Sequence, residues 1–286
     1  MSCIKDFENT VENKWCPGCG NHAILSAMKD ALVNLSLEPH EVLLVSGIGQ
    51  AAKAPHYLNC NLFHGLHGRA LPAATGAKAA NHSLSILVNS GDGDCYGEGG
   101  NHFINAIRRN VDITLLVHNN KVYGLTKGQA SPTSDLHMIT RAQPHGVILE
   151  PFNPLAVSLA LQCGFVARGY AGSPEHLSML IQEGVKHKGF SLIDILQPCV
   201  SFNQVNTYQW YSQRVYDLEK EGHDPSSYMK AMTKALERGD RIPIGIFYKE
   251  DKPSFTDRIE SLQAGPLVDR AYDPSKLSAV LEHFSK

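Results

Sequence analysis

The stretch SILVNSGDGD at residues 85–94, followed by ITLLVHNN at residues 113–120, decides the fold of this chain. Each stretch opens with an apolar run of strand length, and residues 100–109 between them have the length and period of an amphipathic helix. A strand, a glycine turn, a helix and a second strand form a unit whose ligand lies beyond the carboxyl ends of its parallel strands. The sequence therefore predicts a ligand site at residues 91–94.

Polar side chains follow both strands at the point where each is expected to end. Asp92 and Asn120 would lie at the tips of adjacent parallel strands, and Val122 is placed to offer a backbone carbonyl. Carboxylate, amide and carbonyl oxygens suit Mg²⁺. Gly91 and Gly93 would let the backbone approach a diphosphate closely, with a helix N-terminus facing the anion. The spacing resembles the magnesium–diphosphate motif of thiamine-diphosphate enzymes.

The same alternation continues along the chain and indicates an α/β fold with a doubly wound, mostly parallel sheet. Apolar runs of strand length occur at residues 42–46, 85–89, 113–118, 165–170 and 190–196. Helical periods occur at residues 21–35, 100–109, 153–162 and 173–187. We expect residues 1–202 to form the main domain.

Residues 203–286 differ in character, being aromatic, mixed in charge and interrupted by Pro and Gly. We expect an irregular C-terminal extension that packs on the main domain and on a partner subunit. Within it, residues 228–238 are predicted to be helical. Residues 242–248 resemble an edge strand, because Pro243 cannot donate a hydrogen bond to a sheet.

Composition excludes several classes of protein. The net charge of −2 offers no field that would hold a nucleic acid. No apolar run approaches the roughly 20 residues of a membrane span. The opening MSCIKDFENT carries two acids where a signal peptide would be basic and then apolar, so we expect a cytoplasmic protein. Seven cysteines in such a chain indicate metal ligation or buried thiols rather than disulfides.

A second motif is WCPGCGNH at residues 15–22, in which Cys16 and Cys19 flank a glycine turn. The pair suits half of a zinc site, a redox dithiol or two ligands of an iron-sulfur cluster. No second C-x₂-C follows for zinc, and no strand precedes the motif as a thioredoxin-like dithiol requires. A cluster would need distant cysteines, and Cys199, at the end of a predicted strand, is a candidate.

Seven motifs in this order resemble the β subunit of 2-oxoacid:ferredoxin oxidoreductases over roughly residues 14 to 250. They are WCPGCGNH, SGIG at 46–49, HGLHGRALPAATGAK at 64–78, GDGD at 91–94, NHFINAIRRN at 101–110, NNKVYGLTKGQASPTS at 119–134 and QPC at 197–199. The resemblance implies an enzyme that decarboxylates a 2-oxoacid on thiamine diphosphate, forms an acyl-coenzyme A and passes electrons through a [4Fe-4S] cluster to ferredoxin.

The resemblance also implies roles for individual residues. The Mg²⁺ ligands would be Asp92, Asn120 and the carbonyl of Val122. Lys53 would lie near the active centre, as would His67. The residues that match cofactor-contacting positions are Ile48, Gly49, Gln50, Ala51, His67, Gly93, Asp94, Gly124 and Leu125.

Cys16, Cys19 and Cys199 match three ligands of the family's cluster, but the fourth position departs from it. Where the family usually reads SGIGC, this chain reads SGIGQ, with Gln50 in the place of a cysteine. Cys60, ten residues further on, is the nearest replacement, and an extended loop could bring it within reach. A ligand from outside the chain, a non-cysteine ligand, a partner's cysteine and the absence of a cluster are the alternatives.

The family implies a larger α subunit as an obligate partner. Thiamine catalysis needs a protein carboxylate that contacts the aminopyrimidine ring of the cofactor. We expect this chain to supply only the half of the site that binds the diphosphate. Among substrates we favour 2-oxoglutarate, then pyruvate. Two rival functions are a non-redox thiamine-diphosphate decarboxylase or carboligase, and a non-catalytic electron-transfer or scaffold subunit that has kept the fold.

Overall fold

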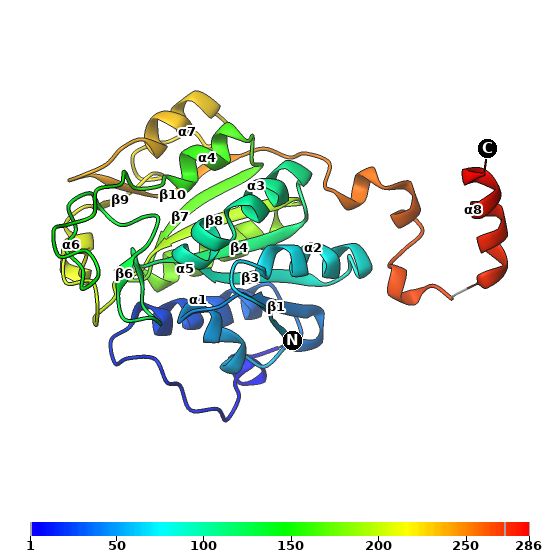
Figure 1. Cartoon of the computed structure of the whole chain (residues 1–286), viewed down its shortest axis with the longest axis horizontal. Helices are drawn as coiled ribbons and strands as arrows, with labels where there is room; N and C mark the ends of the chain where they lie inside the picture. Colours follow the sequence, from blue (N-terminus) through cyan, green and yellow to red (C-terminus); the bar gives the residue numbers. More distant parts are fainter. Residues whose placement is uncertain (1, 272, 286) are drawn as a thin grey trace.

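A single eight-stranded sheet forms the centre of the computed structural model, which describes residues 2–271 and 273–285 (Figure 1). The strand order is β2-β1-β3-β4-β8-β7-β10-β9, and a separate two-stranded sheet pairs β5 with β6. The strands are β1 (Val42–Ser46), β2 (Asn61–His64), β3 (Ser85–Gly91), β4 (Ile113–Asn119), β5 (Val122–Tyr123), β6 (Gln129–Ala130), β7 (Phe165–Tyr170), β8 (Phe190–Leu196), β9 (Val215–Asp217) and β10 (Ile242–Lys249).

Helices cover both faces of the sheet, so the α/β prediction is confirmed. The α-helices are α1 (Gly20–Asn34), α2 (Ala70–Ala80), α3 (Gly100–Arg109), α4 (Pro154–Ala160), α5 (Pro174–Lys186), α6 (Tyr208–Ser212), α7 (Tyr228–Ala235) and α8 (Leu277–Phe284). A π-helix, η4 (Gly93–Glu98), follows β3. Short 3₁₀ helices are η1 (Ile4–Phe7), η2 (Pro39–Glu41), η3 (Ala51–His56), η5 (Thr256–Arg258), η6 (Glu260–Leu262), η7 (Leu267–Asp269) and η8 (Pro274–Lys276). Within the described ranges, no helix is both long and apolar enough to cross a membrane.

Side chains alternate between the two faces of the central strands and build two cores. On one face, Ile113, Leu115 and Val117 of β4 join a core that also contains Phe103 of α3. On the other face, Leu116 joins a core with residues of α1 and α5. Because these strands are buried on both faces, their sequences read as continuous apolar runs.

The parallel pairing of β3 with β4 positions the site. The register pairs Leu87 with Thr114 and Gly91 with His118, so the two strands end side by side. Asp92 and Asn120, which follow these ends, therefore lie at the same edge of the sheet.

The C-terminal segment contributes more to the sheet than the sequence indicated. β10 runs antiparallel to β7, and the three-residue β9 pairs parallel with the first part of β10. The prediction that residues 242–248 form an edge strand is therefore wrong: β9 is the edge strand, and β10 is the next strand inward. Pro243 is accommodated because the hydrogen bonds to the β9 segment are made on either side of it, from Ile242 N to Arg214 O and from Leu218 N to Ile244 O, both 2.9 Å.

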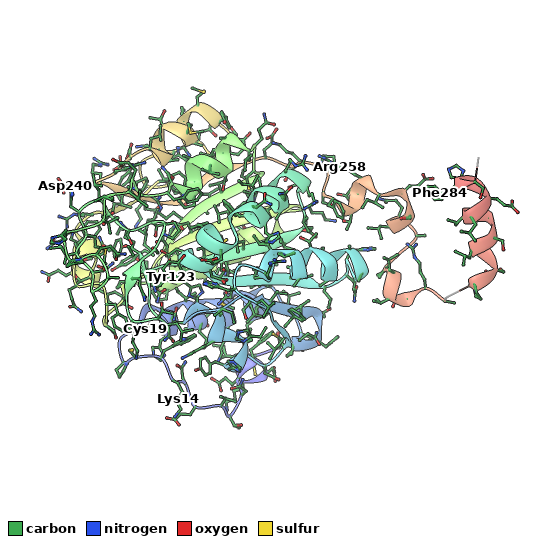
Figure 2. The ribbon with its side chains drawn as sticks, viewed as in Figure 1. Lys14, Cys19, Tyr123, Asp240, Arg258 and Phe284 are labelled. Carbon is green, nitrogen blue, oxygen red and sulfur yellow. The ribbon has the colours of Figure 1, made fainter. Side chains whose placement is uncertain are left out.

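The chain after β10 adds no further strand within the described residues. Figure 1 shows this last segment leaving the domain as an arm that carries α8 at its far end. Figure 2 shows Phe284 there, away from the sheet, and its side chain is 83% exposed.

One prediction concerns the core. Phe103 is fully buried and packs its ring against Tyr96 and Phe190, with ring centroids 5.3 and 6.3 Å away. Phe103→Ala should lower the free energy of unfolding by about 3–5 kcal/mol, because it leaves a cavity. The neighbouring Ile104, 41% exposed, is the control, and Ile104→Ala should change the value by less than about 0.5 kcal/mol. Chemical denaturation measures both; equal losses would contradict this description of the core.

Candidate functional site

The nine cofactor-contacting residues and the three Mg²⁺ ligands predicted from the sequence all line one cavity at the carboxyl edge of the sheet, here called the cofactor cavity. Its floor is the glycine turn after β3. A Cβ atom at Gly93 would lie 2.3 Å from the Tyr123 ring, so only glycine fits there. A Cβ at Gly91 would meet nothing within 4 Å, and Gly49 has a positive φ of 126° and equally open surroundings. This exposed backbone fits the close approach of a diphosphate.

Asp92 lies buried at the end of β3 and is 1% exposed. Its Oδ2 accepts hydrogen bonds from Ser131 Oγ at 2.5 Å and Thr133 Oγ1 at 2.6 Å. Burial raises the pKa of Asp92 to about 6, although the two hydroxyls oppose the shift. A buried carboxylate without a cation nearby is costly, so a bound divalent ion would stabilise it.

The loop after β4 supplies the remaining oxygen atoms. Asn120 Oδ1 accepts a hydrogen bond from Val122 N at 3.0 Å, and Lys121 between them has a positive φ of 61°. Asn120 and Val122 both line the cofactor cavity with Asp92. The donor set of carboxylate, amide and carbonyl oxygens fits Mg²⁺, and these three residues would hold it.

Asp94 lines the cofactor cavity, and its carboxylate is hydrogen-bonded to several groups of the protein. Its Oδ1 accepts hydrogen bonds from Ile48 N at 3.0 Å, Gly68 N at 2.8 Å and His67 Nδ1 at 2.6 Å, and Ser90 Oγ donates to Oδ2. The carboxylate therefore joins three segments of the cavity wall. It also orients the His67 ring, whose Nε2 is left for a bound group.

Behind Asp92 lies a buried polar chain. The Thr133 hydroxyl is 2.8 Å from Asn119 Oδ1, and Asn119 Nδ2 donates to Asp194 Oδ1 at 3.1 Å. Asp194 also accepts from the Tyr96 hydroxyl at 3.0 Å and faces Arg168 at 3.6 Å. Burial raises the pKa of Asp194, against the pull of the Arg168 charge.

The sequence analysis assigned no role to Ser131 and Thr133, the hydroxyl partners of Asp92. Both lie in the SPTS stretch at residues 131–134, at the end of the motif NNKVYGLTKGQASPTS. That motif indicated the family but no contact of these hydroxyls. These hydroxyls are about 40 residues away from Asp92 in the sequence, and no sequence pattern predicts a contact over such a separation. Only the folded chain brings them to Asp92.

A second cavity, here called the cysteine cavity, contains Cys16, Cys19 and Cys199, together with Trp15, Gln50 and Gln197. Gly18, with a positive φ of 78°, makes the turn between the first two cysteines. Ser201 Oγ donates to Cys16 Sγ at 3.2 Å, and Gln197 Nε2 donates to Cys19 Sγ at 3.5 Å. Burial raises the pKa of the Cys19 thiol, and the neighbouring sulfurs of Cys199 and Cys16 raise it further.

The three thiols line one cavity. Among the described residues, no three His, Cys, Asp or Glu side chains converge closely enough to hold one metal ion. Thiolates that bind different irons of a cluster stand farther apart than thiolates that share one ion. Three cysteines from two segments of the chain are a donor set that suits an iron-sulfur cluster.

The structure does not bring Cys60 and Lys53 to these cavities. The Cys60 thiol donates to the Asn61 carbonyl at 3.3 Å, and burial raises its pKa to about 12. Cys60 packs against the core beside α1 and does not line the cysteine cavity. Lys53 lies half-buried in η3 and does not line the cofactor cavity.

The two cavities adjoin. Gln50, Asn120 and Gly124 border both of them, so the sulfur site and the predicted cofactor site share a wall. Asn120 comes from the end of β4, and Gln50 from the loop after β1.

The chain resembles known proteins over most of its length. Residues 45–195 match the family described as thiamine pyrophosphate enzyme, C-terminal TPP binding domain, and residues 199–264 match the family of the C-terminal part of the pyruvate ferredoxin oxidoreductase beta subunit. The chain is 49% identical over 251 residues to the 2-oxoacid:ferredoxin oxidoreductase subunit beta of Saccharolobus solfataricus, and the match covers 84% of this chain and 82% of that protein. The chain belongs to the 2-oxoacid:ferredoxin oxidoreductase beta-subunit family.

Two further relatives are informative. The 2-oxoglutarate synthase subunit KorB of Archaeoglobus fulgidus is 35% identical over 249 residues, which are 87% of this chain and 89% of that protein. A solved 2-oxoglutarate:ferredoxin oxidoreductase from Magnetococcus marinus, with 2-oxoglutarate, coenzyme A and succinyl-CoA bound, aligns with a TM-score of 0.90 at 35% identity. The alignment covers 97% of this chain and 95% of that chain. The recognition of the family from its motifs is confirmed, as is a thiamine-diphosphate-binding domain.

A prediction follows from the raised pKa of Asp92. The folded value of about 6 exceeds the ordinary 3.8, so the ionised group costs the metal-free fold stability. That cost is absent below pH 3.8, grows as the pH rises through the folded pKa, and reaches about 3 kcal/mol above it. Asp92→Asn should therefore raise the melting temperature of the metal-free protein at neutral pH.

The same variant should lose the stabilisation that Mg²⁺ and thiamine diphosphate give to the unmodified protein, because a carboxylate ligand is missing. Melting curves with and without both additions measure the two effects. Asp94→Asn is the contrasting variant, since it removes an acceptor of several hydrogen bonds and should lower the melting temperature in every condition. A stabilisation by Mg²⁺ that survives in Asp92→Asn would contradict the assignment.

Proposed function

We propose that this chain is the subunit on which a 2-oxoacid, 2-oxoglutarate first and pyruvate second, is oxidatively decarboxylated to an acyl-coenzyme A, with electrons passing through a [4Fe-4S] cluster to ferredoxin. The observation that supports this most is the wall shared by the cofactor and cysteine cavities. Electrons released at one cavity would cross only a layer of side chains to reach the other.

Binding of the organic cofactor falls to the glycine turn and the Mg²⁺ ligands. Asp92, Asn120 and the Val122 carbonyl would hold Mg²⁺, and the open backbone at Gly91 and Gly49 would admit the diphosphate. When bound, thiamine diphosphate supplies the electron sink that decarboxylation of a 2-oxoacid needs.

His67 is the titratable side chain placed to act beside the diphosphate. Its Nδ1 donates to Asp94, so the neutral ring presents Nε2 as an acceptor and the protonated ring presents it as a donor. The carboxylate of Asp94 fixes the ring's tautomer and orientation. The Nε2 atom of His67 is thus left to contact a group bound in the cofactor cavity.

The cluster would be held by Cys16, Cys19 and Cys199. Hydrogen bonds from Ser201 and Gln197 to two of the sulfurs would lower the electron density on them and raise the reduction potential.

An α subunit would complete the active site. A beta subunit implies such a partner, and the surface beside the cofactor cavity carries exposed apolar side chains that would suit it. Ile148 and Leu149 are 84% and 73% exposed, in a loop that borders a hollow next to Tyr123. Helix α8 exposes Leu277, Val280, Leu281 and Phe284 in the same way, and we propose that the arm also packs on a partner.

The proposal for the substrate comes from the relatives. Several are named 2-oxoglutarate synthase subunit KorB, and the solved neighbour holds 2-oxoglutarate and succinyl-CoA.

The test is anaerobic co-purification with the α subunit, followed by assays of viologen reduction with 2-oxoglutarate, pyruvate and a branched 2-oxoacid. We expect reduction that depends on coenzyme A and thiamine diphosphate, fastest with 2-oxoglutarate, and none from this chain alone. Carbon dioxide release without viologen reduction would instead support a non-redox decarboxylase. A complex that binds no thiamine diphosphate would leave a scaffold subunit.

Lys53 provides a separate prediction. If it meets the substrate carboxylate in the assembled enzyme, Lys53→Ala should raise the KM for 2-oxoglutarate about tenfold and leave kcat nearly unchanged. Lys29→Ala, at a position in α1 that is half-buried like Lys53, is the matched control. An unchanged KM in steady-state assays would assign Lys53 to the solvated surface.

A further inference from the structure

The wall of the cysteine cavity contains three thiols and two amide side chains that also line the cofactor cavity, Asn120 and Gln50. Asn120 is the proposed Mg²⁺ ligand, which leaves Gln50 for the cysteine side. Each of the four irons of a [4Fe-4S] cluster needs a ligand from the protein, and the cysteines of this cavity supply three of these four ligands. Gln50 lies on the side that faces the cofactor cavity, where it approaches Gly124. A Cβ atom at Gly124 would lie 3.7 Å from Gln50 Cγ.

The main chain of Gln50 is held directly beside the cysteine turn. Trp15, the residue before Cys16, donates its indole Nε1–H to the Gln50 carbonyl at 2.7 Å. Trp15 is 6% exposed, and its ring packs edge-on against Tyr57, with the ring centroids 4.8 Å apart. The backbone that carries the Gln50 side chain is thus fastened to the segment that carries two of the thiols.

The other cysteines are not available as the fourth ligand. The Cys60 thiol points to the Asn61 carbonyl and packs in the core next to α1. Cys95 and Cys163 are buried in the core on the other face of the sheet, and Cys3 precedes η1. None of these four lines the cysteine cavity.

Two buried polar atoms in the cavity wall lack partners. Asn21 and Gln197 are 0% and 2% exposed, and Asn21 Nδ2 and Gln197 Oε1 have no hydrogen-bond partner among the described residues. Buried polar atoms are nearly always satisfied in native proteins, so these two atoms are open to a contact with a group bound in the cavity.

Resting on the proposed function, we infer that the cluster in this cavity is bound by only three cysteines, and that Gln50 supplies the fourth ligand. One iron then lacks a thiolate and faces the amide oxygen of Gln50 on the side of the cofactor cavity. An amide oxygen binds iron more weakly than a thiolate, so this iron is the most easily lost. Replacing a thiolate by a neutral ligand also removes one negative charge, which raises the reduction potential.

The experiment compares the anaerobically purified complex with the α subunit in three forms: unmodified, Gln50→Cys and Cys60→Ser. Each is analysed for iron and acid-labile sulfide, by Mössbauer spectroscopy after ⁵⁷Fe labelling, and by EPR before and after brief mild oxidation. The unmodified complex should show one iron in four that is distinct from the rest. Oxidation should convert its cluster to a three-iron form with an EPR signal in the oxidised protein.

Gln50→Cys should abolish both the distinct iron and the three-iron signal, and should lower the reduction potential. Cys60→Ser should behave like the unmodified complex. Four equivalent irons in the unmodified complex would overturn the inference, as would loss of the fourth iron in Cys60→Ser. If Gln50→Cys does not fold, the Mössbauer result on unmodified protein still decides whether the cluster has three thiolates or four.

Failure of the proposed function has a different signature. A complex with the expected spectra and no oxoacid-dependent viologen reduction would contradict that function and leave this inference standing. A complex with oxoacid-dependent activity and four thiolate-bound irons would support the proposed function and contradict the role of Gln50. Absence of iron and sulfide from the complex would overturn both the cluster and the role of Gln50.

Discussion

The buried carboxylate of Asp94 is the interaction on which the site depends. It accepts hydrogen bonds from two backbone N–H groups, a histidine ring and a hydroxyl that come from separate parts of the chain. A buried charge persists only when such donors surround it. The loops after β1 and before α2 are therefore fixed against the end of β3. A Cβ at Gly47 would lie 2.0 Å from Asp94 Oδ2, so this approach requires a glycine.

The fold was predictable wherever a strand is buried on both faces. The ranges predicted for β1, β7 and β8 agree with the structure to the residue, because apolar runs bounded by Gly, Asn or Pro leave little choice. β2 was missed because all four of its residues are exposed and its edge position demands no apolar pattern. α2 was missed because ALPAATGAKAA, rich in alanine and interrupted by proline and glycine, has a weak helical period.

The gathering of the candidate site residues in one cavity was predictable, but their contacts were not. The spacing of the motifs predicted that Asp92 and Asn120 lie at one edge of the sheet, because neighbouring parallel strands end together. It could not show that Ser131 and Thr133 reach back to Asp92, nor that Asp94 points into the protein to bind the loop of His67. The prediction of Cys60 as the fourth ligand rested on its nearness in the sequence, whereas position in the cavity depends on how the loop after β1 folds.

The wall shared by the two cavities has a consequence for assembly. An occupant of one cavity that held Gln50, Asn120 and Gly124 in place would leave these residues ordered for the occupant of the other. Such a coupling is reciprocal, because each occupant changes the affinity for the other by the same factor. Maturation of the subunit would then be cooperative, with empty and fully loaded chains predominating and half-loaded chains scarce.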